Sequence, residues 1–153
     1  MNFTKLFTSR IPASLLSKQV QRTYNKRAAA ALLKLRRVQI DDDGLFPYVM
    51  IKVYIHGVTR FPRTIIRGKF NSSHKAVYNA ARRELGSMEL CTNPLGGGYL
   101  DVDMDKRKIY IYGGCQTFGI ADHAKTQEIL MSWTKYKDFQ IRVGERPKPK
   151  QIP

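Results

Sequence analysis

Residues 95–124 read LGGGYLDVDMDKRKIYIYGGCQTFGIADHA, and this stretch decides the fold. Tyr99 to Asp103 and Lys108 to Tyr112 are rich in β-forming residues and flank a short polar turn, which predicts an antiparallel hairpin. The glycine-bearing loop Gly113 to Gly119 follows, and a helix is expected over Ala121 to Trp133. The stretch therefore predicts strand, strand, loop and helix in direct succession.

Upstream residues extend this pattern. Tyr48 to Ile55 form a run of β-formers typical of a central strand, and Thr64 to Arg67 predict a second strand that ends at Gly68. Asn71-Ser72-Ser73 supply side-chain oxygens suited to capping a helix, which is expected over His74 to Leu85. Three further strand segments are expected at Val38 to Ile40, Glu89 to Asn93 and Phe139 to Val143.

The element order predicts one α/β (α+β) domain, with a mixed β-sheet of about six strands flanked by two helices. A chain of 153 residues that is 42% hydrophobic has room for one core of ordinary size. We expect the domain over residues 36–143. A basic leader over residues 1–35 precedes it, and a disordered Pro- and Lys-rich tail over residues 144–153 follows it.

The leader carries a strong positive charge. The first 40 residues hold nine Lys or Arg and no Asp or Glu, and the segment MNFTKLFTSRIPASLLSKQVQRTYNKR places apolar residues near helical intervals. This composition is typical of a mitochondrial presequence, although Pro12 interrupts the amphipathic run and a disordered basic extension explains the segment equally well. The two interpretations place the protein in the mitochondrion or in the cytoplasm.

Charge and cysteine content limit the classes of partner and site. The formal net charge of +15 favours anionic partners, among which phosphate groups are the commonest, while nucleic acid stays a weaker candidate. The two cysteines, Cys91 and Cys115, show no spacing typical of a disulfide framework or a zinc site. No apolar run approaches membrane-spanning length, so we expect no membrane partner. We also expect no metal and no cofactor.

Two helix starts could hold an anion, because a helix N-terminus presents unpaired N–H groups and the positive end of the helix dipole. His74 stands at the first start, and a neutral imidazole can accept a proton or attack phosphorus. The glycines of the loop from Gly113 to Gly119 allow successive N–H groups to point at one place before the second start. From pattern alone, a solvent-facing cap histidine and a plain connecting loop explain both features as well.

An ordered set of short motifs resembles the janus/ocnus and phosphohistidine phosphatase family, over about Val38 to Val143, and most resembles its insect sex-regulated branch. The motifs that carry the resemblance are Asp43-Gly44-Leu45-Phe46, Tyr48-Val49-Met50-Ile51, Ile66-Arg67-Gly68, His74, Leu95-Gly96-Gly97-Gly98, Ile109-Tyr110-Ile111-Tyr112-Gly113, Phe118-Gly119 and Ala121-Asp122-His123-Ala124.

The resemblance implies a metal-independent protein phosphatase, a hydrolase that acts on phosphohistidine, associated with sexual differentiation. It places His74 at the position of the essential histidine, the proton acceptor. It places Cys115, Gln116 and Thr117 at the phosphate-binding loop. Arg67 is a further candidate for substrate binding. The expected partner is a phosphohistidine-bearing protein or another phosphorylated ligand, bound by a monomer.

The sequence also departs from the resemblance at two places. Pro47 and Tyr99 stand where phosphatases of the family carry basic residues, so two charges that would neutralise phosphate are missing. Lys52, Arg63 and Lys69 are candidates to replace them. The loss makes reduced activity the expectation, and the alternative is a non-catalytic member that binds a phosphoprotein or another anion in male germline differentiation.

Overall fold

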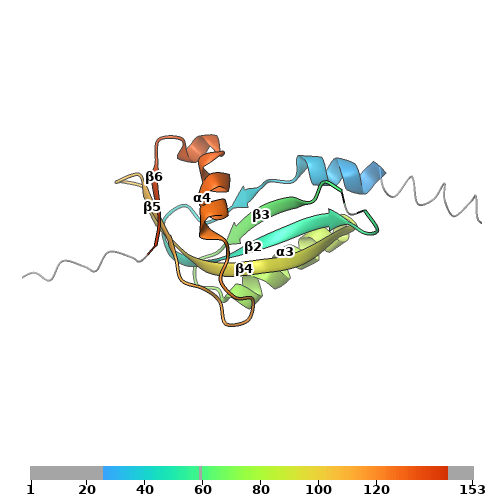
Figure 1. Cartoon of the computed structure of the whole chain (residues 1–153), viewed down its shortest axis with the longest axis horizontal. Coiled ribbons are helices and arrows are strands. Elements are labelled where there is room, and N and C mark those ends of the chain that lie inside the picture. Colours follow the sequence, from blue (N-terminus) through green and yellow to red (C-terminus); the bar gives the residue numbers. More distant parts are fainter. Residues whose placement is uncertain (1–25, 59, 145–153) are drawn as a thin grey trace, which may run out of the picture.

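The computed structural model describes residues 26–58 and 60–144, which form a mixed, six-stranded β-sheet with helices on both faces (Figure 1). The strands are β1 (Val38–Gln39), β2 (Gly44–Ile55), β3 (Arg63–Gly68), β4 (Leu90–Asp103), β5 (Lys108–Tyr112) and β6 (Gln140–Val143). Their order across the sheet is β1-β3-β2-β4-β5-β6. The outer pairs β1/β3 and β5/β6 are parallel and the inner pairs are antiparallel, which confirms the predicted α+β class.

Alternation along β2 divides the core into two layers. Val49, Ile51 and Val53 pack on the side of α3 (His74–Ser87), together with Val77 and Leu85 of that helix. Tyr48 and Met50 face the other side, where they pack with Ile129 and Leu130 of α4 (His123–Met131). The two helices therefore lie on opposite faces of the sheet (Figure 1).

Side-chain caps begin both helices. The Ser73 hydroxyl accepts a hydrogen bond from the N–H of Ala76 at 3.1 Å, as expected from the polar residues before α3. The carboxylate of Asp122 accepts from the N–H of Lys125 at 3.2 Å and begins α4 at His123. The helix α4 is shorter than the predicted span, since Trp133 already caps a following 3₁₀ turn, η1 (Thr134–Tyr136).

One long strand replaces the two strands predicted on either side of the triple glycine. The strand β4 pairs with β2 from Leu90 to Val102, and Leu95 forms a bulge because Met50 pairs with Gly96 while Ile51 pairs with Pro94. The pairing of β2 with β4 continues on both sides of the bulge, so the segments predicted at Glu89 to Asn93 and Tyr99 to Asp103 belong to one strand.

The folded unit begins before the boundary expected at residue 36. A helix over residues 26–34 precedes β1, and Ala28, Leu32 and Leu35 are buried in the α3-side core. The Arg63 guanidinium donates from Nη1 to the carbonyl oxygens of Leu32 at 2.9 Å and Leu33 at 2.8 Å, which satisfies carbonyl groups at the end of this helix. The rest of the expected leader, residues 1–25, and the tail from residue 145 lie outside the described residues.

Truncating Leu32 tests whether this helix belongs to the fold. Leu32→Ala should lower the free energy of unfolding by about 2 kcal/mol, because it leaves a cavity in the α3-side core. Leu33→Ala is the matched control, since Leu33 is 78% exposed and its loss should change little. Urea unfolding of both variants measures the difference. Equal stability of the two variants would show that the helix does not pack as described.

Two negative findings hold for the residues that the structure describes. No helix there is long and apolar enough to cross a membrane. No group of three His, Cys, Asp or Glu side chains there could hold a metal ion.

Candidate functional site

His74 is the first residue of α3, and its ring is fixed against the sheet. Its Nε2 lies 2.7 Å from the carbonyl oxygen of Gly98 in β4. Because a carbonyl oxygen can only accept, Nε2 carries the proton and donates it, which leaves Nδ1 as the nitrogen able to accept one. The Tyr99 ring packs edge-on against the imidazole, with 5.0 Å between centroids. Two neighbours on one strand thus set the tautomer and orientation of the ring.

The His74 ring packs directly against the triple glycine of β4, at Gly97. A Cβ atom on Gly97 would lie 2.9 Å from Cδ2 of His74, closer than real Cβ atoms approach, and 3.0 Å from Cβ of Cys115, which is tighter than most real contacts. On the opposite face, a Cβ atom on Gly98 would lie 2.7 Å from Cε1 of His123. The glycines therefore let the helix start and the loop approach the strand.

The loop between β5 and α4 is a closed turn. The N–H of Cys115 donates to the carbonyl of Gly119 at 3.1 Å, and the N–H of Gly119 donates to the carbonyl of Cys115 at 2.8 Å. Gly97 ties the turn to β4, since its N–H donates to Gly119 at 3.1 Å and its carbonyl accepts from Ala121 at 3.1 Å. Gly119 has a φ of 80°, in the left-handed region that glycine adopts without strain.

At the tip of this turn, the N–H groups of Gln116, Thr117 and Phe118 donate no hydrogen bond within the described part of the chain. Adjacent N–H groups with no partner are the usual donors to a phosphoryl group. The tip can therefore serve as an anion-binding turn.

His74 and the turn share one pocket of about 450 Å³. Its walls are formed by Ser73, His74, Lys75, Tyr99, Gly114, Cys115, Gln116 and Thr117. The structure thus brings together His74 and all three loop residues singled out in the sequence. Ser73, Lys75 and Gly114 were missed there as pocket residues. The place of Lys75 directly after His74 at a helix start was the available signal.

Arg67 does not lie in this pocket. Its side chain extends on the α3 side of β3, where Nη1 donates to the carbonyl oxygens of Arg36 at 3.0 Å and Ile66 at 3.1 Å. It lines a separate cavity beside Val77 and Glu84 in the middle of α3. The expected contact between Arg67 and the substrate of His74 therefore finds no support in the geometry.

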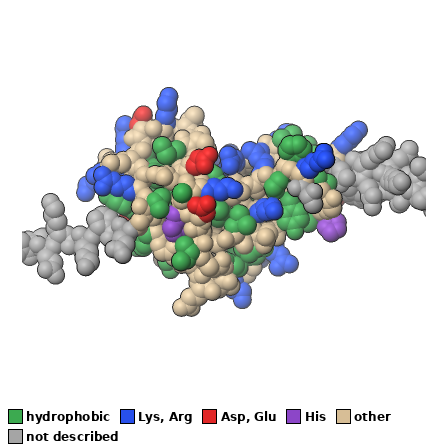
Figure 2. Space-filling model, viewed as in Figure 1, with side chains coloured by type: hydrophobic (Ala, Val, Ile, Leu, Met, Phe, Trp, Pro, Cys, Tyr) green, Lys and Arg blue, Asp and Glu red, His purple; other side chains and the backbone are tan. Residues whose placement is uncertain are grey.

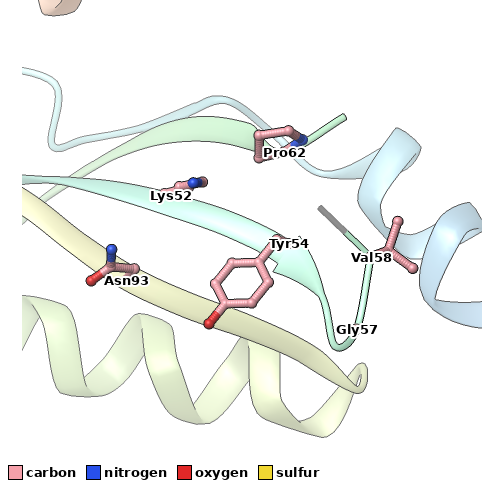
Figure 3. Close-up of a pocket in the computed structure, with 6 residues that line it drawn as sticks. All are labelled: Lys52, Tyr54, Gly57, Val58, Pro62 and Asn93. Atoms are coloured by element: carbon pink, nitrogen blue, oxygen red, sulfur yellow. The ribbon is translucent and has the colours of Figure 1, made fainter. Parts of the chain in front are cut away.

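The three basic residues considered as replacements for the missing charges also lie elsewhere. Lys52 projects from β2 into a different cavity, together with Tyr54 (Figure 3). Arg63 binds the helix over residues 26–34, and Lys69 lines the cavity of Arg67. Lys75 supplies the positive charge in the His74 pocket.

The two departures from the family pattern are neighbours in space, because Pro47 in β2 pairs with Tyr99 in β4. Proline is tolerated at this place since β2 pairs with β3 only from Tyr48 onward, so no bond to that neighbour is lost. Tyr99 occupies the pocket wall with its ring against His74 and, on its other side, stacked on Tyr112. The pocket wall thus has an aromatic ring at Tyr99, where the resemblance led us to expect a basic residue.

His123 ties the loop to the sheet. Its Nε2 donates to the carbonyl of Gly113 at 2.7 Å, and its Nδ1 lies 2.6 Å from the hydroxyl of Tyr48. Burial raises the pKa of Tyr48 to about 12, so the phenol keeps its proton and donates it to Nδ1. The Tyr48 oxygen also lies 3.0 Å from the hydroxyl of Thr126. This network holds the start of the loop in place.

Removing one hydroxyl from that network should be measurable. Tyr48→Phe should lower the free energy of unfolding by about 1 to 2 kcal/mol, because it removes the donor to Nδ1 of His123 and leaves Thr126 with only its hydrogen bond to the carbonyl of Asp122. Tyr54→Phe, on an open part of the sheet, is the matched control and should change little. Thermal and urea unfolding report the difference. If Tyr48→Phe is as stable as the control, the network does not hold the loop.

Comparison with known proteins gives a consistent assignment. The model of the Janus/Ocnus family matches residues 32–140. Sex-regulated protein janus-B of Drosophila pseudoobscura pseudoobscura is 48% identical over 127 residues, which cover 83% of this chain and 89% of that protein. Sex-regulated protein janus-B of Drosophila teissieri is 41% identical over 113 residues (74% and 80%), and that of Drosophila melanogaster is 40% identical over 115 residues (75% and 81%). The chain belongs to the Janus/Ocnus family.

Proposed function

We propose that the chain binds a phosphoryl group in the His74 pocket and hydrolyses protein phosphohistidine without a metal ion. One observation carries the proposal. An imidazole with a fixed Nε2 donor shares a pocket with a turn at Gln116 and Thr117. Within the described residues, neither Nδ1 of this imidazole nor the N–H groups of the two turn residues have a hydrogen-bond partner. The basic surface supports an anionic substrate, because Lys and Arg side chains are spread over the visible face with few acidic ones among them (Figure 2).

In the proposed reaction a water molecule attacks phosphorus and the P–N bond of phosphohistidine breaks. Nδ1 of His74 accepts a proton from the attacking water, while the departing imidazole of the substrate takes the bond's electron pair and a proton from solvent. The N–H groups at the tip of the turn hold the phosphoryl oxygens as charge redistributes over them. The products are histidine and inorganic phosphate.

A second candidate is a non-catalytic protein that binds a phosphorylated partner in the same pocket. Its support is the wall itself, where Tyr99 takes the place of a family charge and Lys75 is the one Lys or Arg among the residues that line the pocket. Fewer charges weaken stabilisation of the transition state more than binding of the ground state. The reduced charge therefore favours slow turnover or binding alone.

Both candidates act in sex-specific differentiation, which the name of the relatives, sex-regulated protein janus-B, supports. In the first case the partner is a phosphohistidine-bearing protein, and in the second it is a phosphorylated protein or another anionic ligand. In either case a single copy of this chain binds it, in the mitochondrion or the cytoplasm.

Turnover separates the two candidates. Purified full-length protein is incubated with an excess of a phosphohistidine peptide in EDTA, and released phosphate is measured beside peptide binding. Release of many equivalents of phosphate per protein, unaffected by EDTA, is the expected result. Saturable binding without release beyond the spontaneous rate would establish the binding protein instead. Neither binding nor release would refute both candidates.

Lys75 should contribute to binding of the phosphoryl group. Lys75→Ala removes a cation from the pocket wall and should weaken affinity for inorganic phosphate by about three- to tenfold at low salt. Because the side chain is exposed, the difference should shrink as salt concentration rises. Arg82→Ala, an exposed charge on the same helix outside the pocket, is the matched control. Equal affinities of the two variants would exclude Lys75 from the site.

A further inference from the structure

Arg67 lies beneath a second cavity that shares no lining residue with the His74 pocket. Its side chain is 6% exposed, so it is almost completely removed from solvent. The cavity has a volume of about 400 Å³ and lies between α3 and the edge of the sheet formed by β1 and β3. Val77 and Ala81 of α3 and Ile40 after β1 give it apolar walls.

The guanidinium of Arg67 has an unpaired edge. Nη1 is occupied by the two carbonyl oxygens of Arg36 and Ile66. Nε is buried and has no hydrogen-bond partner among the described residues, and Nη2 forms no hydrogen bond there either. Leaving a charged, buried donor unpaired is costly, so this edge requires an acceptor.

Glu84 is an acidic residue that lines the cavity, but it does not pair with this edge of Arg67. Burial lowers the pKa of Arg67, and the negative charge of Glu84 partly opposes this effect. The two residues nevertheless form no ion pair or hydrogen bond in the described structure. Glu84 and Asp41 line the cavity as acids, and the Asp41 carboxylate already accepts from the N–H of Phe70 at 2.5 Å. An outside acceptor therefore has room beside Arg67.

The chemistry of the cavity selects the kind of ligand. The Nε and Nη2 groups of an arginine present two parallel N–H donors, which match the two oxygens of a carboxylate. The cavity is lined by two bases, Arg67 and Lys69, and by two acids, Asp41 and Glu84, so its formal charge does not favour a dianion over a monoanion. The apolar wall of Val77, Ala81 and Ile40 suits a short hydrocarbon group attached to the carboxylate.

We propose that this cavity is a binding site for a small aliphatic carboxylate, held by the unpaired edge of Arg67. The site is independent of the function proposed for the His74 pocket.

Titration of the full-length ¹⁵N-labelled protein with propionate tests the site, because the Nε–H signal of an arginine is observed directly by NMR. Propionate should shift the Nε–H signal of Arg67 and the backbone signals of α3 from Val77 to Glu84 in one saturable process. Inorganic phosphate should shift the same signals at least about tenfold less tightly. No saturable shift of the Arg67 Nε–H signal with propionate, or tighter binding of phosphate there, would overturn the assignment.

Two variants sharpen the test. Arg67→Lys keeps the positive charge but lacks the paired donors, and it should weaken propionate binding by about tenfold or more. Glu84→Gln removes a competing carboxylate at an exposed position and should strengthen binding. The second variant preserves the test if Arg67→Lys does not fold. Weaker binding of propionate to Glu84→Gln than to the unaltered protein would show that the cavity is not a carboxylate site.

Discussion

Replacing His74 by alanine should reduce the rate of phosphohistidine hydrolysis by about 10²- to 10⁴-fold, the usual contribution of a positioned proton acceptor. The reason lies in the hydrogen bond between His74 and β4. The carbonyl of Gly98 fixes Nε2 as a donor at 2.7 Å, so Nδ1 is the nitrogen that can take the proton of the attacking water. Release of phosphate from a phosphohistidine peptide in a single turnover measures the chemical step without product release.

His74→Gln separates the chemical role of this residue from a structural one. A glutamine amide can still donate to the carbonyl of Gly98, but it cannot accept a proton as imidazole does. It should therefore be folded and as inactive as the alanine variant. His56→Ala, in an exposed loop, is the control and should keep full activity. Substantial hydrolysis by His74→Gln would mean that the imidazole only holds the helix start against the sheet.

Gly97→Ala should damage both stability and the site. Its new Cβ would lie 2.9 Å from His74, 3.0 Å from Cys115 and 3.0 Å from the backbone oxygen of Tyr48, and none of these neighbours can move freely. We expect a loss of about 3 kcal/mol in the free energy of unfolding, at the upper end for overpacking. Binding of inorganic phosphate should be lost as well, because the helix start and the turn are pushed apart.

Gly86 gives a matched control for that substitution. It lies inside α3, and a Cβ atom there would meet no other atom within 4 Å. Gly86→Ala should therefore raise the free energy of unfolding by about 0.5 to 1 kcal/mol, the preference of a helix for alanine over glycine. Urea unfolding of both variants tests the pair. If Gly97→Ala is tolerated like Gly86→Ala, the close approach over the triple glycine is wrong.

Local patterns in the sequence predicted the parts of the site that depend on neighbouring residues. Ser73 before an amphipathic run predicted where α3 begins, and a residue at that start necessarily lies at the helix N-terminus. The glycines of the loop predicted a turn that could aim N–H groups at one point. Because β5, the turn and α4 are consecutive, their arrangement follows from chain connectivity. His74 and Thr117 were paired only through the resemblance to the family.

Features set by long-range pairing were not predictable in the same way. Which face of the sheet Arg67 takes depends on its register with Val49, which places its side chain on the α3 side. There it lines the cavity beside Val77 and Glu84, not the pocket at the start of α3 that holds His74. The unbroken strand β4 depends on a bulge at Leu95 that only the partner β2 can reveal. The helix over residues 26–34 was hidden in a leader whose charge suggested a separate segment, although its burial depends on Leu32 meeting the α3-side core.

The central claim is that the Nδ1 side of His74 and the N–H groups of one turn hold the same phosphoryl group. Titration of the ¹⁵N-labelled protein with inorganic phosphate tests it most directly, because each N–H group reports its own environment. Phosphate should shift the backbone signals of Gln116, Thr117 and Phe118 together with the imidazole signals of His74, all with one dissociation constant. Shifts at the turn without His74, or at neither of them, would contradict the account.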